Sequence, residues 1–299
     1  MKPSITVTVG MCVRNCEATI KEAMESIIGQ HFPYELMELI IVDGCSKDRT
    51  LLIIKDCLSK TNIKNKVFCE NEGLGRARQI VVDNSSGNYI IWVDGDMLLS
   101  KDFVRKQVEF MERNPAVGIA KGRYELCPGA NLLSTLEIYS RVADKITDYS
   151  LEKARFKSLG TSGCIYRIEA IRQVGGFDQN IRGYGEDWDA EYRVRTIGWS
   201  LCTNQAYYRD YERFGVTWKE LWRRYWKRGY DLNYFFQKYR GVIHLYRMLP
   251  LIAFISGLLN SLALYKLTRQ KIVFFLPFQC IFKMTVWWLG YIGRSLAFV

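Results

Sequence analysis

The chain has little histidine and no zinc-type cysteine pair. It carries two histidines and nine cysteines in 299 residues, and no two cysteines are spaced Cys-x-x-Cys. Cys12 and Cys16 have no matching cluster of cysteine or histidine, so a zinc site is not expected. The odd cysteine count and the absence of a signal-peptide pattern favour reduced thiols on the cytoplasmic side of a membrane.

Two glycine-rich nucleotide motifs are also absent. The sequence contains neither the G-x-G-x-x-G fingerprint nor the P-loop lysine motif, which argues against NAD chemistry and ATP hydrolysis. Acidic residues are scarce in one region: positions 213–247 hold nine Lys or Arg against two acids, in a chain of net charge +11. Such a basic block is typical of contact with nucleic acid or an anionic membrane surface.

The most informative stretch that is present runs from Tyr89 to Leu99. Its apolar, β-branched and aromatic residues end abruptly at Asp94-Gly95-Asp96. This pattern predicts a buried parallel strand with two carboxylates at its carboxyl end. Open α/β sheets bind ligands at this end of their strands. Carboxylate oxygens suit Mg²⁺ or Mn²⁺ that carry substrate phosphates. The alternative is a simple turn, because Asp-Gly pairs often follow strands for that reason alone.

Strand and helix patterns alternate through the first half of the chain. We predict strands at 5–9, 36–42, 66–69 and 117–124, a central strand that begins at Tyr89 and ends at Asp94-Gly95-Asp96, and helices at 17–28, 51–58, 75 onward, 102–113, 132–145 and 169–173. This alternation indicates an α/β fold with a mostly parallel sheet flanked by helices. It places Asp43, the Gly73–Arg78 loop and the Asp94/Asp96 pair on one rim of the sheet.

Six short motifs follow one another in the first two-thirds of the chain. They are Arg14-Asn15, Val42-Asp43-Gly44-x-Ser46-x-Asp48-x-Thr50, Asn71-x-Gly73 with Ala77-Arg78, Asp94-x-Asp96, Gly175-Gly176-Phe177-Asp178 and Gly185-Glu186-Asp187-x-Asp189. In this order they resemble the family-2 inverting glycosyltransferases of GT-A (Rossmann-like) fold, and are distantly similar to enzymes of the cellulose-synthase and dolichyl-phosphate-sugar-synthase type. The resemblance covers residues 4–212. Cys12 departs from it, because the family usually has a proline there.

The resemblance implies a nucleotide-sugar donor, linked to GDP or UDP, and a set of residues that bind it. These residues are Asn15, Asp43, Gly73, Arg78 and Asp94. Asp43 is expected at the base or ribose, and the Gly73–Arg78 loop near the nucleotide. A divalent cofactor, Mg²⁺ or Mn²⁺, at Asp94 and Asp96 would neutralise the charge that develops on the departing diphosphate.

Inverting transfer also needs a general base for the acceptor hydroxyl. Neither His31 nor His244 lies in the motif set, so a carboxylate is expected, and the resemblance points to Asp187. Glu186 is the second catalytic candidate, as a less favoured base or as a residue that orients the acceptor. The alternative is that these acids only begin a helix, since carboxylates are favoured at helix N-termini.

The C-terminal third has a different character. Residues 212–241 mix aromatic and basic side chains, which predicts an amphipathic helix at a membrane interface. Part of it resembles the Gln-x-x-Arg-Trp motif of processive family members. Arg224 keeps the arginine, which would reach the diphosphate, but Leu221 and Tyr225 replace the Gln and Trp, so a polymerising activity is not supported.

Residues 242–299 predict a two-helix transmembrane hairpin after a catalytic domain at 1–211. The apolar runs 242–265 and 272–299 are each long enough to cross a bilayer. The basic block at 213–247, around the start of the first run, holds nine cations, and three lie in the link between the runs. This imbalance places the catalytic domain on the cytoplasmic side of an integral protein of the cell membrane.

Together these observations predict an enzyme that moves a hexose from a nucleotide-diphosphate sugar to a lipid-linked acceptor. The resemblance favours mannose, with GDP-mannose and UDP-glucose both open. One alternative is a polysaccharide synthase or an enzyme with a soluble acceptor. The other is a non-catalytic basic protein that binds membrane or nucleic acid. That reading leaves Asp94, Asp96 and Asp187 without a role, so no nucleic-acid partner is expected.

Overall fold

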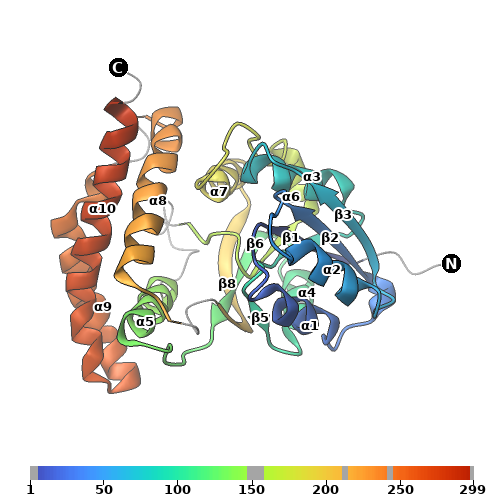
Figure 1. Cartoon of the computed structure of the whole chain (residues 1–299), viewed down its shortest axis with the longest axis horizontal. Coiled ribbons are helices and arrows are strands. Elements are labelled where there is room, and N and C mark those ends of the chain that lie inside the picture. Colours follow the sequence, from blue (N-terminus) through green and yellow to red (C-terminus); the bar gives the residue numbers. More distant parts are fainter. Residues whose placement is uncertain (1–5, 147–157, 211–214, 241–244, 297–299) are drawn as a thin grey trace. The chain divides into compact units, whose positions relative to one another are not determined.

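The computed structural model describes residues 6–146, 158–210, 215–240 and 245–296, which form two units (Figure 1). The first unit comprises Met1–Glu125, Asp148–Arg182 and Glu186–Asp210. The second comprises Leu126–Thr147, Gly183–Gly185 and Tyr211–Val299. The segment 126–147 therefore groups with the C-terminal helices, although it lies inside the predicted catalytic domain 1–211. Parts of the sequence predictions, among them Ile5, His244 and residues 297–299, lie outside the described residues.

A mixed sheet forms the centre of the first unit. Its strands are β1 (Val7–Val13), β2 (Met37–Asp43), β3 (Lys64–Cys69), β4 (Tyr89–Trp92), β5 (Leu98–Leu99), β6 (Val117–Tyr124), β7 (Cys164–Arg167) and β8 (Ser200–Arg209), in the order β3-β2-β1-β4-β7-β6-β8-β5. The β3-β2-β1-β4 half is parallel throughout, while β7 is antiparallel to both of its neighbours and β5 is antiparallel to β8. The α/β class is thus confirmed.

Helices cover both faces of this sheet, because alternate residues of the inner strands point to opposite faces. The helices are α1 (Ile20–Ile28), α2 (Thr50–Leu58), α3 (Leu74–Asn84), α4 (Phe103–Arg113), α6 (Ile168–Gln173) and α7 (Glu186–Thr196). In β4, Ile91 joins a core with α1, α2 and α4, and Trp92 joins a second core with α3, α6 and α7 (Figure 1). The sheet therefore lies between two buried apolar layers.

The predicted central strand is confirmed: β4 begins at Tyr89 and Asp94 follows its end, where the Met97 amide donates to the Asp94 carbonyl and turns the chain toward β5. The other strands differ from the prediction in two ways. β1 begins at Val7 and continues to Val13, past the predicted end at 9. Strands β7 and β8 were not predicted. β7 has only four residues, and β8 carries Thr203, Asn204 and Gln205 in its middle, so neither has a clear apolar period.

The second unit is helical. It contains α5 (Leu132–Ile146), α8 (Trp218–Lys238), α9 (Pro250–Thr268) and α10 (Leu276–Leu296), with 3₁₀ turns at Leu245–Met248 and Lys271–Phe275. A capping box of Thr217 and Glu220 begins α8, and Pro250 occupies the first turn of α9, where a missing N–H is tolerated. Within the described part of the first predicted apolar run, the α-helix begins at Pro250. Pro250–Thr268 and Lys271–Leu296 are long and apolar enough to cross a membrane by length and composition.

Gly175 and Gly176 allow a test of how α6 ends. Both have positive φ (77° and 79°), but a Cβ on Gly176 would lie 2.0 Å from Gln79 Oε1, and one on Gly175 would meet nothing within 4 Å. We expect Gly175→Ala to lower the free energy of unfolding by roughly 1–2 kcal/mol, the cost of a left-handed alanine. Gly176→Ala should cost about 1–3 kcal/mol more, because Gln79 must move. Equal thermal shifts for the two variants would contradict this packing.

Candidate active site

The loops after β1 and β2 are tied together at the carboxyl edge of the sheet. Asp43 ends β2 and is buried, and its carboxylate accepts hydrogen bonds from the Ser46 amide (2.9 Å) and hydroxyl (2.5 Å). Asn15 has a positive φ of 52°, donates its amide to Ser46 Oγ (2.9 Å) and accepts from the Lys47 amide (2.9 Å). The predicted residues Asn15 and Asp43 thus share Ser46, whose position in the motif did not by itself indicate this role.

Gly73 fixes the start of α3. Its φ is 143°, and a Cβ there would lie 2.5 Å from the Cα of Arg182. The amides of Leu74 and Gly75 donate to the carbonyls of Arg182 (3.1 Å) and Ile181 (3.0 Å). Only glycine allows this close approach, which anchors the first turn of α3 and so places Arg78 one turn further along the helix.

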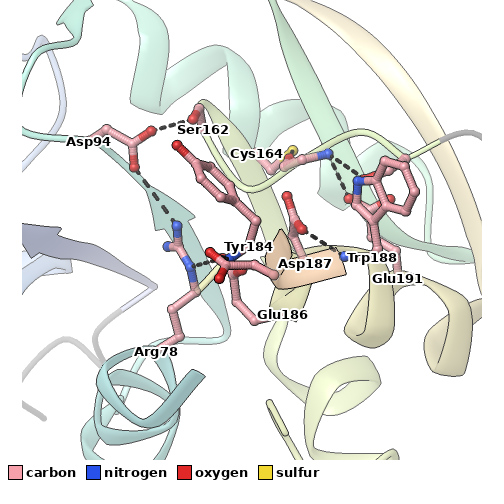
Figure 2. A network of polar contacts seen from close by, with 12 residues as sticks. Arg78, Asp94, Ser162, Cys164, Tyr184, Glu186, Asp187, Trp188 and Glu191 are labelled. Carbon is pink, nitrogen blue, oxygen red and sulfur yellow. Dashed lines mark hydrogen bonds and ion pairs between the residues drawn. The ribbon is translucent and has the colours of Figure 1, made fainter. Parts of the chain in front are cut away.

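Arg78 is a buried cation between two carboxylates. Its Nε donates to Glu186 Oε1 at 3.0 Å, and its Nη2 lies 3.9 Å from Asp94 Oδ1 (Figure 2). The guanidinium carbon is 4.8 Å from the Trp92 ring centroid. Burial alone would lower the pKa of Arg78, but Glu186, Cys12 and Asp94 raise it. The side chain therefore stays charged and joins the end of β4 to the start of α7.

Asp94 and Asp96 follow β4 as predicted, and both are partly exposed. Asp94 Oδ2 accepts a hydrogen bond from Ser162 Oγ (Figure 2). Among the described residues, no group of three or more His, Cys, Asp or Glu side chains could hold a metal ion. Two carboxylates still fit Mg²⁺ or Mn²⁺, because such ions are usually bound by one or two carboxylates, substrate phosphates and water.

Glu186 and Asp187 occupy the first turn of α7. Burial, together with the neighbouring Asp187 charge, raises the pKa of Glu186 to about 8, although Arg78 acts in the opposite direction. Asp187 is only partly buried, and its Oδ1 accepts from the Trp188 amide at 2.8 Å (Figure 2). Glu186 is thus committed to Arg78, whereas Asp187 is the more accessible carboxylate.

The loop 158–163 connects the Asp94 and Asp187 positions, and sequence reasoning gave it no role. Glu191 accepts hydrogen bonds from the amides of Leu159 and Gly160, both at 2.8 Å. A Cβ on Gly160 would lie 3.5 Å from Asp187 Oδ2, and Ser162 donates to Asp94. The spacing of Asp187 and Glu191, four residues apart on one helix, is the signal that could have identified Glu191.

Asp189 has a structural position. It is fully buried and pairs with Arg193, whose guanidinium also donates to the carbonyls of Val174 (2.5 Å) and Gly176 (2.7 Å). This contact fixes α7 against the turn after α6. Asp189 therefore supports more than the start of the helix.

Arg224, the remaining predicted donor-binding residue, belongs to the second unit. Its Nη1 lies 3.7 Å from Glu137 Oε2 in α5. Its contact with a diphosphate therefore remains a prediction.

Comparison with known proteins identifies the class of fold and the family. Residues 8–175 match the model of glycosyl transferase family 2. The mannosyltransferase PcManGT from Pyrobaculum calidifontis, solved with GDP-Man and Mn²⁺, has a TM-score of 0.65 at 14% identity, covering 98% of this chain and 88% of that one. TarS 1–349 of S. aureus with UDP-GlcNAc has a TM-score of 0.54 at 15% identity, covering 98% and 92%. The fold is therefore that of GT-A transferases.

Curated relatives agree with this assignment. Poly(ribitol-phosphate) beta-N-acetylglucosaminyltransferase TarS of Staphylococcus aureus is 26% identical over 46% of this chain and 27% of its own length. The probable glycosyltransferase YdaM of Bacillus subtilis is 24% identical over 100% and 67%. Poly-beta-1,6-N-acetyl-D-glucosamine synthase of Staphylococcus epidermidis is 20% identical over 72% and 52%. The chain thus spans only about a quarter of TarS in the first of these matches.

The chain belongs to glycosyl transferase family 2, as the order of its motifs predicted. The matched region contains Asp43, Arg78, Asp94 and Asp96 but ends before Glu186 and Asp187.

The raised pKa of Glu186 predicts a pH-dependent stability. The folded state holds a proton on Glu186 between the ordinary pKa of 4.5 and about 8, where the unfolded chain has lost it. The free energy of unfolding should therefore fall as pH rises through this window, by on the order of 1 kcal/mol per pH unit, relative to Glu186→Gln. Thermal midpoints of both proteins in detergent from pH 5 to 8.5 measure the difference. Parallel curves would contradict a raised pKa.

Proposed function

We propose that this protein transfers a hexose from a nucleotide-diphosphate sugar to a lipid-linked acceptor, with inversion at the anomeric carbon. The observation that carries the proposal is the rim of the first unit, where a family-2 chain joins Asp94, Arg78 and Glu186 through direct contacts, with Asp187 next in the chain. Asp94 follows a strand, Glu186 and Asp187 begin a helix and Arg78 lies one turn into α3; open α/β sheets bind ligands at the carboxyl ends of their strands.

The donor would lie against the loops after β1 and β2 and beside Asp94. Asp43, Ser46 and Asn15 form a hydrogen-bonded loop pair, which would contact the base or ribose. A divalent ion at Asp94 and Asp96 would supply charge neutralisation for the leaving diphosphate. The GDP-Man and Mn²⁺ in the solved PcManGT complex support both assignments and the preference for mannose, and the UDP-GlcNAc complex of TarS keeps a UDP-linked donor open.

Asp187 is the proposed base. Its carboxylate is partly exposed and is not paired with Arg78, so it can accept the proton of the acceptor hydroxyl as the new bond forms. Glu186, buried on Arg78, would position the first turn of α7 and the acceptor side of the site. Asp94 and Arg78 remain on the donor side.

A lipid-linked acceptor is favoured by the second unit. Its helix α8 carries aromatic and basic side chains, and α9 and α10 are strongly apolar, which suits an enzyme held at the cytoplasmic face of a membrane. A polysaccharide synthase is the second candidate, supported by the poly-N-acetylglucosamine synthase relative. Leu221 and Tyr225, in place of the Gln and Trp of processive members, favour single transfer.

The metal assignment predicts a chelator-sensitive reaction. EDTA should abolish sugar transfer, and Mn²⁺ or Mg²⁺ should restore it. Without a divalent cation, the two carboxylates would face the negative charge of the leaving diphosphate with charge of the same sign. Asp96→Asn should raise the metal concentration needed for half-maximal transfer, while Asp56→Asn, an exposed carboxylate in α2, should not. Nucleotide release, followed with several donors, measures transfer. Full activity in a metal-free preparation would contradict the metal assignment.

The base assignment predicts a loss of transfer with donor binding kept. Asp187→Asn retains the shape of the side chain and removes its basicity, so transfer should fall by on the order of 10²–10⁴-fold. Donor affinity should stay near that of the wild type, because Asp43, Asp94 and Asp96 are unchanged.

Asp56→Asn serves again as the matched control, since Asp189→Asn would disturb the buried Arg193 contact. Near-normal transfer by Asp187→Asn would remove it as the base. A product with retained configuration would reject single displacement altogether.

A further inference from the structure

We propose that the α9–α10 hairpin lies flat in one leaflet of an anionic bilayer instead of crossing it. This inference rests on the proposed membrane attachment but not on the sugar-transfer reaction. It replaces the two predicted membrane crossings with a single in-plane layer. The evidence is what packs against the two apolar helices within the second unit.

Helix α8 lies alongside α10 for most of its length. The Trp218 and Phe282 rings are 4.8 Å apart, and further along both helices Asn233 Nδ2 donates to Ser295 Oγ at 2.8 Å. Between these contacts the two backbones touch, since a Cβ on Gly229 would lie 1.8 Å from the Trp287 carbonyl oxygen. At ~1.5 Å per residue, the shared length from Phe282 to Ser295 is about 20 Å of a helix of about 30 Å.

Because α8 packs along α10, a membrane-crossing α10 would bring the charged side chains of α8 into the hydrocarbon core. Its sequence contains six Lys or Arg and two acidic residues within 21 positions. Lys219, Arg223 and Lys227 are among those exposed to solvent. If α10 crossed the bilayer, it would carry these charges through about two-thirds of a hydrocarbon core of about 30 Å, where charged side chains are costly.

The turn between α9 and α10 is held by α5. Tyr139 Oη donates to Gln270 Oε1 at 2.6 Å, and α5 shares an apolar cluster with Leu264 and Val273. Glu137 of α5 pairs with Lys283 of α10 at 2.5 Å. A hairpin that crossed the bilayer would place its turn on the far side, and α5 would have to follow it there.

Chain length makes that arrangement impossible for α5. Seven residues separate the end of β6 at Tyr124 from the start of α5 at Leu132. Fully extended, the eight Cα–Cα steps from Tyr124 to Leu132 reach at most about 29 Å, which is less than a hydrocarbon core of about 30 Å and far less than the about 40–45 Å of a bilayer with its headgroup layers. The start of α5, and through α5 the hairpin turn, must therefore stay on the side of the first unit.

The exposed apolar side chains show what the hairpin contacts. On α10, Phe278, Leu289, Ile292 and Leu296 are exposed at positions i, i+11, i+14 and i+18, which fall on one stripe of a helix. On α9, Leu251 and Leu259 are 70% and 63% exposed. Leu251, Ile255, Leu258 and Leu262 of α9, at positions i, i+4, i+7 and i+11, are likewise exposed along one side of that helix. An apolar side on each helix suits insertion to the depth of the headgroup and acyl boundary.

Charge selects an anionic leaflet as the partner. The turn exposes Lys266, Arg269 and Lys271, and α8 exposes its own cations beside Trp222 and Trp226. In a crossing hairpin the turn cations would lie on the side opposite the basic block, against the usual distribution of positive charge. In the flat arrangement all of these cations meet the same anionic headgroups.

The side on which the turn lies tests the proposal. Full-length wild-type protein in sealed inverted and right-side-out vesicles is treated with trypsin, which cuts at Lys266, Arg269 and Lys271. In parallel, Lys271→Cys is reduced, freed of reductant and then labelled with a membrane-impermeant maleimide. The exposed native thiols Cys45 and Cys69 of the first unit are the internal markers of sidedness.

We expect the turn to be cut, and the introduced thiol to be labelled, in the same vesicles as Cys45 and Cys69, with at least tenfold preference over the other orientation. Labelling or cutting only in the opposite orientation would overturn the flat arrangement while leaving membrane attachment intact. Purified protein should also pellet with preformed phosphatidylglycerol vesicles. A failure to pellet with any vesicle would reject membrane attachment itself, and the nucleotide-release assay separates both results from the transfer reaction.

Discussion

The buried guanidinium of Arg78 is the interaction on which the site depends. It lies 3.0 Å from Glu186 and 3.9 Å from Asp94, and so joins the end of β4 to the start of α7. A buried donor that loses its hydrogen-bond acceptor typically costs about 1–3 kcal/mol, and more where the donor is charged, as this guanidinium is. The positions of the proposed donor and acceptor sides are therefore coupled through one cation.

The remaining contacts of the rim continue from the Arg78–Glu186 contact along α7. With α7 fixed at its start by Arg78 and further along by Asp189 and Arg193, Glu191 faces the loop 158–163 and accepts two of its amides. That loop returns Ser162 to Asp94. The network thus closes on itself, which limits how far either carboxylate can move when substrates bind.

Much of the fold, but less of the site, follows from the sequence. Residues 117–124 form the predicted strand, and Asp94 and Asp96 follow β4 as predicted, because local apolar period and turn chemistry specify these elements. Ser162 and Glu191 were missed because their partners are 68 and about 32 residues away. β7 was missed because its pairing with β4 and β6, not its four residues, makes it a strand.

The C-terminal helices also depend on contacts that the pattern of their own residues does not reveal. Hydropathy depends on the composition of a segment, and by that measure α9 and α10 are equivalent. Their neighbours differ: α10 is covered by a charged helix and carries Lys283 paired with Glu137, while α9 exposes most of one face. Helix α10 would enter a bilayer together with α8, because the two backbones are in close contact at Gly229 and Trp287 and separating them would lose that packing. The topology of such a hairpin is therefore decided by its tertiary contacts and not by its apolar length.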